Sequence, residues 1–148
     1  MSDYQSVEHI IEALTLKEKL SQLFVVGYWG SSIPDDLVDW ANNSLGGLIF
    51  FSENITSTSQ IKSLITDIQQ QSSLKLFMSV DQEGGFVERI KGAIQIPTAM
   101  ALSASGDLDN VAIAASILSE ELKSLGFNLN FAPVLDVNTN PDNPIIGI

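Results

Sequence analysis

The sequence predicts an α/β fold built on a parallel sheet, and three observations lead to it. Short apolar segments alternate along the chain with segments of helical periodicity, which is the pattern of repeated strand–helix units. The apolar segments carry apolar residues at both odd and even positions, as strands do when helices cover a parallel sheet. A length of 148 residues with 45% hydrophobic residues is enough for one domain with a real core.

The first third of the chain predicts two helices and one strand. Residues 15–22 form a helix whose start is marked by Thr15 as N-cap and Glu18 three residues later, the capping-box pattern. Residues 23–28 (LFVVGY) follow at once as a buried strand. Residues 34–43 form the next helix, with a proline in the first turn.

The remainder of the chain continues the alternation. Strands are expected at residues 48–51, 74–80 and 127–133, and helices at residues 56–71 and 107–125. Gly126 is a suitable C-cap for the last helix, because glycine tolerates the left-handed conformation found there. The tail, residues 138–148, holds two prolines and three asparagines and is expected to be a loop.

Four strands joined by three main crossovers correspond to the N-terminal half of a TIM-type (β/α)8 barrel, whose complete form takes about 250 residues. A small open sheet of four strands is equally compatible with the pattern. The sequence pattern alone leaves both arrangements open.

Charge and composition exclude several classes of protein. The net charge of −11 repels phosphate backbones and anionic lipid, so neither nucleic acid nor membrane is an expected partner. The absence of cysteine excludes disulfides, thiolate nucleophiles and zinc–thiolate sites. Residues 1–12 lack the pattern of a signal peptide and no apolar run is long enough to span a membrane, which predicts a cytoplasmic protein.

The only histidine, His9, lies in an N-terminal segment, residues 6–11, that reads as helix. We expect it at the surface or at a helix end. A Ser-His-Asp triad within this chain is therefore not expected.

The most informative motif is the stretch from residue 76 to residue 89, where an apolar strand runs directly into polar residues. Asp81 and Glu83 follow the strand, two glycines come next, and Arg89 stands eight residues after Asp81. Ligands bind at the carboxyl ends of strands in α/β proteins. Asp81 can accept two hydroxyl hydrogen bonds, and the planar fork of Arg89 suits neighbouring hydroxyls or a carboxylate. An ion pair between Asp81 and Arg89 is the structural alternative, and the two roles are compatible.

Five ordered blocks give the sequence a family resemblance. They are residues 46–51 (GGLIFF), 80–85 (VDQEGG), Arg89, 96–102 (IPTAMAL) and 130–137 (NFAPVLDV). In this order and spacing they resemble the N-terminal barrel domain of family 3 glycoside hydrolases, and most of all its bacterial β-N-acetylglucosaminidase (β-N-acetylhexosaminidase) branch. The resemblance extends from about Leu14 to Ile148.

The resemblance implies a (β/α)8-type barrel that cleaves terminal β-linked sugars with retention, through a covalent glycosyl-enzyme. It identifies Asp81 as a contact to sugar hydroxyls and Arg89 as a second substrate-binding residue. It implies a carbohydrate substrate and neither a metal ion nor an organic cofactor. Phe86 departs from the family, which usually has arginine directly after the two glycines.

The resemblance also implies what these 148 residues do not contain. The remaining sugar contacts and the nucleophilic aspartate belong to later blocks of the family. We therefore expect residues 1–148 to be a partial domain that lacks the C-terminal half of the barrel. It would hold no catalytic residue and would be inactive alone.

Four further residues are candidates of lower rank. Glu83 and Asp136 are expected to organise loops, although a ligand contact by Asp136 is the alternative. Trp29 stands at a plausible rim position for stacking on a sugar, whereas Trp40 is expected to pack in the core or at the surface.

Two other functions are compatible with the sequence. The chain could be a non-catalytic carbohydrate-binding fragment. It could also self-associate, because a half-barrel exposes unpaired strand edges and apolar faces, and two copies would then form a homo-oligomer.

Overall fold

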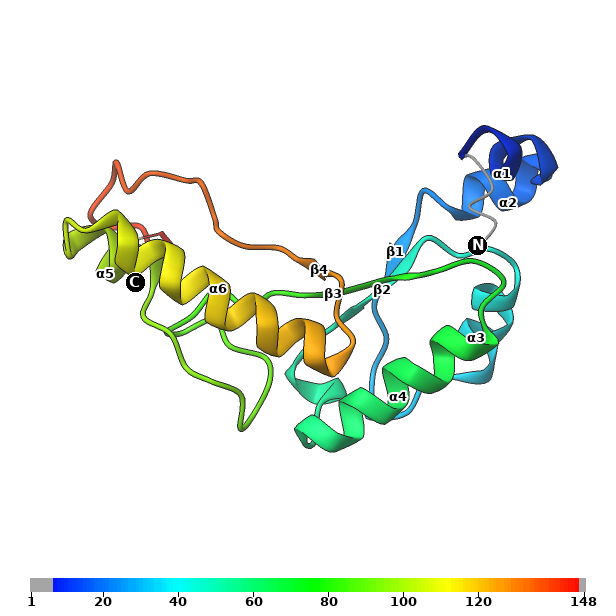
Figure 1. Cartoon of the computed structure of the whole chain (residues 1–148), viewed down its shortest axis with the longest axis horizontal. Coiled ribbons are helices and arrows are strands. Elements are labelled where there is room, and N and C mark those ends of the chain that lie inside the picture. The colour runs from blue at the N-terminus through cyan, green and yellow to red at the C-terminus, as the bar shows by residue number, and fades with distance from the viewer. Residues whose placement is uncertain (1–6, 147–148) are drawn as a thin grey trace.

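A computed structural model describes residues 7–146, and it is built on one sheet of four parallel strands (Figure 1). The strands are β1 (Val25–Val26), β2 (Gly47–Phe50), β3 (Phe77–Val80) and β4 (Leu129–Asn130). Each is hydrogen-bonded in parallel to the next. The predicted α/β fold is confirmed. The first residue of the predicted helix 6–11 and the last two of the predicted loop 138–148 lie outside the described residues.

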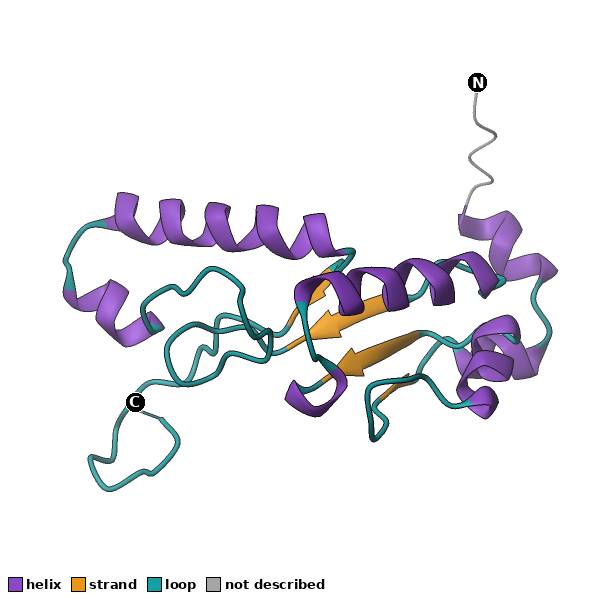
Figure 2. Ribbon diagram, turned by 90° about the horizontal axis from the view of Figure 1, so that it is seen from below, coloured by secondary structure: helices purple, strands orange, loops and turns teal. Residues whose placement is uncertain are grey.

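The strands stand side by side in the order in which they occur along the chain. The helices α3 (Asp35–Asn42), α4 (Thr58–Gln71) and α6 (Leu108–Leu125) connect successive strands and lie on one side of the sheet (Figures 1 and 2). Right-handed crossovers that always advance in one direction place every helix on the same face. This is the wall of a barrel, whereas a doubly wound sheet reverses direction and carries helices on both faces.

Helix boundaries follow the capping residues that the sequence offers. Thr15 and Glu18 form the expected capping box before α2 (Leu16–Ser21), and α1 (Val7–Ala13) precedes it. The hydrogen bond from the Thr15 side chain, followed by that from its backbone, lowers the pKa of Glu18. At the other end of the chain, Gly126 ends α6 with φ of 99°, a left-handed conformation that favours glycine.

The core lies between the sheet and its helices. Phe50 of β2 is fully buried and makes edge-to-face contacts with Tyr28 at 6.0 Å and Phe127 at 5.7 Å between ring centroids. From the helices, α4 and α6 contribute buried aliphatic side chains: Ile61, Ile65, Ile68, Leu118, Leu122 and Leu125. Burying each such side chain is worth about 1.5–3 kcal/mol, so this one-sided core holds the helices on the sheet.

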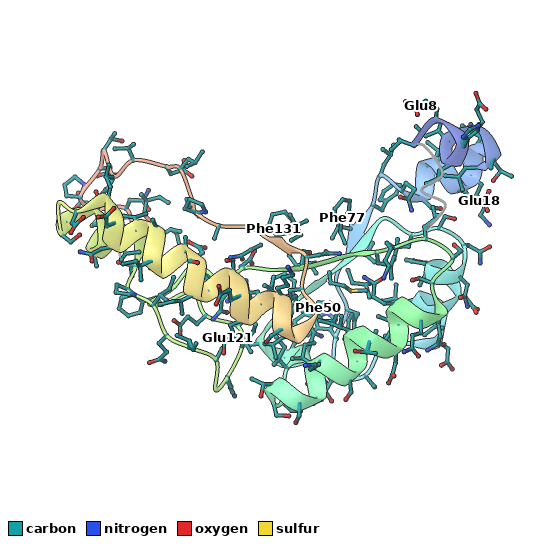
Figure 3. All side chains as sticks on the ribbon, viewed as in Figure 1. Glu8, Glu18, Phe50, Phe77, Glu121 and Phe131 are labelled. Atoms are coloured by element: carbon teal, nitrogen blue, oxygen red, sulfur yellow. The ribbon has the colours of Figure 1, made fainter. Side chains whose placement is uncertain are left out.

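The other face of the sheet is uncovered in the described part of the chain. Phe77 of β3 is 53% exposed, and Phe131, just after β4, is 46% exposed. Figure 3 shows both rings on the side of the sheet away from Phe50 and the helices. Because side chains alternate between the faces of a strand, this open face corresponds to the inside of a barrel wall.

Two strand predictions were wrong in extent or burial. Of the predicted buried strand 23–28 only Val25 and Val26 are paired, and Leu23 is 77% exposed. The reason is position, since β1 has a paired neighbour on one side only and its inner face is open. The predicted strand 127–133 shortens to two residues for the same reason. The short helix α5 (Ala99–Ala104) was not predicted.

The buried phenol of Tyr28 predicts a dependence of stability on alkaline pH. Burial raises the pKa of Tyr28 from 10.0 to about 12, and its hydroxyl has no hydrogen-bond partner among the described residues. The unfolded chain releases this proton first, so the associated stability is complete below pH 10 and is lost as the pH rises to about 12. We expect Tyr28→Phe to flatten this decline and to cost little at pH 7.

Urea unfolding at pH 7 and at intervals from pH 9.5 to 12 measures this effect. All other titrating groups are shared by the two proteins, so they cancel in the difference between wild type and Tyr28→Phe at each pH. A difference that does not change with pH would contradict the prediction.

Candidate functional site

The sequence-predicted pair, Asp81 and Arg89, meets at the carboxyl edge of the sheet. Asp81 follows β3 directly, and the Arg89 Nη2 donates to Asp81 Oδ2 at 3.4 Å. The two side chains remain 23% and 32% exposed, respectively. The pair is therefore partly sheltered from water yet open to a ligand, at the edge where ligands of parallel sheets bind.

The loop between these two residues is a tight turn that depends on its glycines. Gly84 and Gly85 have φ of 95° and 62°, in the left-handed region. The Glu83 N–H donates to the Val87 carbonyl across the turn at 2.9 Å. A Cβ on Gly84 would stand 2.7 Å from the carbonyl oxygen of Pro97, so the turn is closed to larger residues.

A buried glutamine fixes the end of this loop to the strand. Gln82 is 1% exposed, and its Oε1 accepts hydrogen bonds from the backbone N–H groups of Arg89 at 2.8 Å and Ile90 at 3.3 Å. The backbone of Arg89 is thereby held beside the end of β3. From this fixed backbone position, the side chain of Arg89 extends to the carboxylate of Asp81.

Gln82 is held in turn by Asn130 at the end of β4. The Asn130 Oδ1 accepts from the Gln82 N–H at 3.0 Å, and its Nδ2 donates to the Gln82 carbonyl at 2.9 Å. Asn128 does the same at the other end of β4, accepting from the Met78 N–H at 2.7 Å and donating to the Leu76 carbonyl at 2.9 Å. Side-chain amides thus extend the pairing of β3 with β4 beyond the two-residue ladder.

An aromatic ring supports the guanidinium of Arg89. The Arg89 Cζ lies 5.8 Å from the ring centroid of Phe51, which follows β2. This is within the range of a cation–π contact. The Nε of Arg89 is buried and has no hydrogen-bond partner within the described part of the chain.

A cleft of about 560 Å³ lies beside Arg89. Arg89 and Glu83 line it, together with Asp136 and Phe86 and the apolar side chains of Val87, Met100, Val134, Ile145 and Ile146. Its size and its mixture of apolar walls with a few polar groups suit a small organic ligand. A second, mostly apolar cavity of about 340 Å³ lies between α6 and residues 130–133.

The lower-ranked candidates are distributed around this edge. Glu83 contributes a backbone hydrogen bond to the turn, Asp136 is exposed beside the cleft, and Trp29 is an exposed residue after β1. Trp40 lies in α3, away from the carboxyl edge, with half of its surface exposed. Gln82, Asn130 and Phe51 were missed as positioning residues. The sequence did carry one signal, because two asparagines inside a predicted strand are unusual residues for that position.

No group of three or more acidic, histidine or cysteine residues within residues 7–146 is arranged to hold a metal ion. Among the same residues, no helix combines the length and the apolar character that crossing a bilayer requires.

A singly wound parallel sheet with its connecting helices on one face is the architecture of part of a (β/α)8-barrel domain, and the carboxylate–guanidinium pair lies at its carboxyl edge. The family described as "Glycosyl hydrolase family 3 N terminal domain" matches residues 15–148. The chain belongs to this family, and of the two arrangements left open by the sequence the partial barrel is confirmed.

Several members of the family are similar to this chain. Beta-hexosaminidase A from Pseudoalteromonas piscicida is 39% identical over 80% of this chain and 22% of its own length. A family 3 beta-N-acetylglucosaminidase from Paenibacillus sp. str. FPU-7 has a solved structure with TM-score 0.86 and 42% identity, covering 91% of this chain and 27% of that one. NagZ from Neisseria gonorrhoeae, solved in complex with N-trifluoroacetyl-D-glucosamine, gives TM-score 0.65 at 28% identity over 76% of this chain and 36% of its own.

The chain spans about a fifth to a third of the length of the curated relatives it matches, from 22% to 31%. The matched region is therefore only a part of each of those enzymes.

The hydrogen bonds of Gln82 predict that Gln82→Ala loosens the loop that carries Arg89. Two backbone N–H groups would lose their acceptor, which costs about 1–3 kcal/mol when the groups stay buried. We expect the free energy of unfolding to fall by this amount and the Arg89 and Ile90 amides to exchange with solvent much faster. Urea unfolding and amide hydrogen exchange measure the two effects.

Gln71→Ala is the matched control, because that side chain lies on the exposed face of α4 and only donates to the Asp67 carbonyl. It should leave both quantities nearly unchanged. Unaltered exchange at Arg89 and Ile90 in Gln82→Ala would rule out the anchoring role.

Proposed function

We propose that this chain forms part of the sugar-binding pocket of a family 3 glycoside hydrolase. The whole enzyme would hydrolyse terminal β-linked N-acetylglucosamine, or a related β-glycoside, with retention through a covalent glycosyl-enzyme. The observation that carries the proposal is the Asp81–Arg89 pair, 3.4 Å apart and partly open at the carboxyl edge of the sheet. A cytoplasmic location remains a prediction from the sequence.

In this proposal Asp81 and Arg89 bind the non-reducing sugar. The Asp81 carboxylate accepts hydrogen bonds from sugar hydroxyls, and the guanidinium of Arg89 donates to sugar oxygens. Hydrogen bonds to charged groups are roughly twice as strong as those between neutral groups. Gln82 and Phe51 hold Arg89 in place before the ligand arrives, which lowers the entropic cost of binding.

The names of the relatives support the choice of sugar. Two of those reported are a beta-hexosaminidase and a beta-N-acetylglucosaminidase, and a third was solved with an N-acylated glucosamine. A sugar with a free hydroxyl edge and an apolar ring face also suits a cleft that combines the guanidinium of Arg89 and the carboxylates of Glu83 and Asp136 with apolar walls.

The nucleophile is proposed to lie outside these 148 residues, in the C-terminal half of the barrel. A retaining mechanism needs two carboxyl groups about 5–5.5 Å apart with the glycosidic bond between them. Asp81 is engaged by Arg89, and Glu83 belongs to the tight turn. Neither is therefore assigned to catalysis, and the chain alone is expected to bind sugar without cleaving it.

Titration of the chain with N-acetylglucosamine, followed by amide chemical shifts, tests the proposal. We expect saturable shifts in residues 81–90 and at least a tenfold loss of affinity in Asp81→Ala, because a hydrogen bond to a charged group contributes about 1.5–3 kcal/mol. An assay with 4-nitrophenyl N-acetylglucosaminide should show no turnover by the wild-type chain.

Asp67→Ala on α4 is the matched control, because it removes the same charge far from the carboxyl edge, and it should bind like wild type. Equal affinities of wild type and Asp81→Ala, or no binding at all, would overturn the assignment of Asp81. Release of 4-nitrophenol by the pure chain would overturn the placement of the nucleophile. Binding without turnover is also the behaviour expected of a non-catalytic carbohydrate-binding fragment.

Self-association is a second candidate function, favoured by the exposure of Phe77 and Phe131 on the open face. Two copies could pair the β4 edge of one with the β1 edge of the other and close eight parallel strands.

We expect a dimer in light scattering that Phe77→Lys converts to a monomer, because a lysine on this face would be buried in the dimer. Phe86→Lys, on the exposed turn, is the control that should remain dimeric. A monomeric wild type would exclude this candidate.

A further inference from the structure

The side chain of Arg89 is held less firmly than its backbone. Its Nη2 lies 3.4 Å from Asp81 Oδ2, whereas a hydrogen bond between two charged groups is typically about 2.7–2.9 Å long. The Nε of the same guanidinium is buried and has no hydrogen-bond partner among residues 7–146. The direction of the guanidinium therefore depends on a further contact, the ring of Phe51, whose centroid lies 5.8 Å from Arg89 Cζ.

The ring of Phe51 has a close neighbour in Gly27, the residue that follows β1. A Cβ on Gly27 would stand 3.3 Å from Cε2 of Phe51, which is tighter than most Cβ contacts in proteins. The φ of Gly27 lies outside the left-handed region. It is therefore the space for the ring, and not the backbone conformation, that favours glycine at this position.

Asn54 holds the backbone of Phe51 at both of its polar groups. The Asn54 Oδ1 accepts from the Phe51 N–H at 2.7 Å, and the Asn54 N–H donates to the Phe51 carbonyl at 2.9 Å. These two bonds close the single 3₁₀ turn η1 (Ser52–Asn54) directly after Phe51. Because the pairing of β2 with β3 ends at Phe50, it is this turn and not the sheet ladder that fixes Phe51.

The amide of Asn54 is itself fixed in one orientation. Its Nδ2 donates to the carbonyls of Tyr28 at 3.0 Å and Gly30 at 2.8 Å, and the residue is fully buried. A half-turn of this amide would set its N–H groups against the Phe51 N–H and its oxygen against two carbonyls. A buried amide with satisfied hydrogen bonds is rigid, so the segment after β1 and the turn after β2 are joined through one side chain.

We propose that Asn54 and Gly27 are positioning residues for the candidate sugar-binding pair. Asn54 fixes the backbone of Phe51, Gly27 leaves room for its ring, and the ring sets the direction of the Arg89 guanidinium toward Asp81. Neither positioning residue touches the ligand. The effect on sugar binding rests on the proposed function, whereas the effect on the guanidinium is present without any ligand.

The side-chain Nε–H resonance of Arg89 measures this positioning in the full chain without a ligand. The ring of Phe51 shifts this resonance by its ring current, and burial slows the exchange of the proton with solvent. In Asn54→Ala and in Phe51→Leu we expect the resonance to move toward that of a solvent-exposed arginine. Exchange should become about 3- to 10-fold faster in both variants.

Two variants that remove the same groups elsewhere are the matched controls. Asn43→Ala removes an exposed amide that donates to the Asp39 carbonyl at the end of α3. Phe24→Leu truncates an exposed ring that precedes β1, at the opposite end of the strands from Asp81. Both should leave the Arg89 Nε–H resonance and its exchange as in wild type.

A double variant separates positioning from a general loss of stability. We expect Asn54→Ala and Phe51→Leu each to weaken the binding of N-acetylglucosamine about 3- to 10-fold. The double variant should bind no more weakly than Phe51→Leu alone, because Asn54 acts on the site through the ring. Losses of affinity that multiply in the double variant would show a merely structural role for Asn54 and would overturn the inference.

Gly27→Ala tests the same arrangement without removing a hydrogen bond, and it decides the matter if Asn54→Ala does not fold. The added methyl group should displace the Phe51 ring and shift the Arg89 Nε–H resonance. An unchanged resonance in both Gly27→Ala and Phe51→Leu would overturn the inference, as would a shifted resonance with unaltered sugar affinity, and the proposed function would then stand. If the resonance shifts as expected but N-acetylglucosamine does not bind even the wild type, the positioning of Arg89 stands and the proposed function is overturned.

Discussion

The structure depends on how the backbone polar groups are satisfied at the end of a short parallel ladder. The pairing of β3 with β4 covers only two residues, and the N–H and C=O groups beyond it would otherwise be left without partners. Asn128 and Asn130 supply them from their side chains, and Gln82 then supplies the N–H groups of Arg89 and Ile90. These amide hydrogen bonds fix the backbone of Arg89 beside the end of β3, and they thereby set the geometry of the Asp81–Arg89 pair.

The position of the core on one face of the sheet determines which side chains are exposed and where the candidate site lies. Because successive crossovers place α3, α4 and α6 on the same face, the helices bury only half of each strand (Figure 1). Phe77 and Phe131 are exposed to solvent on the opposite face, and Asp81 and Arg89 lie at its carboxyl end. In a complete barrel that face is interior and that end is the mouth, which is where barrel enzymes bind their substrates. A family 3 partial barrel thus combines an exposed apolar interior with a formed polar rim.

Local signals predicted the helices well, whereas burial and the positioning residues required tertiary information. Asp107 and Gly126 define α6 by capping rules that act within a few residues, and the structure has the helix between them. The apolar run at 23–28 indicated a buried strand, but whether a strand is covered depends on its neighbours in the sheet. For the candidate site, one short motif led to the prediction of Asp81 and Arg89, and the structure places their side chains 3.4 Å apart. The contact of Gln82 with Asn130 spans 48 residues, and no local pattern encodes it.

The electrostatics of the pair favour a neutral, hydroxyl-rich ligand over an anion. The chain carries a net charge of −11, and Glu83 and Asp136 line the cleft beside Arg89. An isolated guanidinium would attract phosphate or carboxylate, but the positive charge of Arg89 is already balanced by Asp81 at 3.4 Å. An anion would have to displace Asp81 and approach the other carboxylates. In the proposed site, sugar hydroxyls would instead donate to Asp81 and accept from Arg89 without disturbing the ion pair, so the arrangement of these two residues is compatible with a carbohydrate ligand.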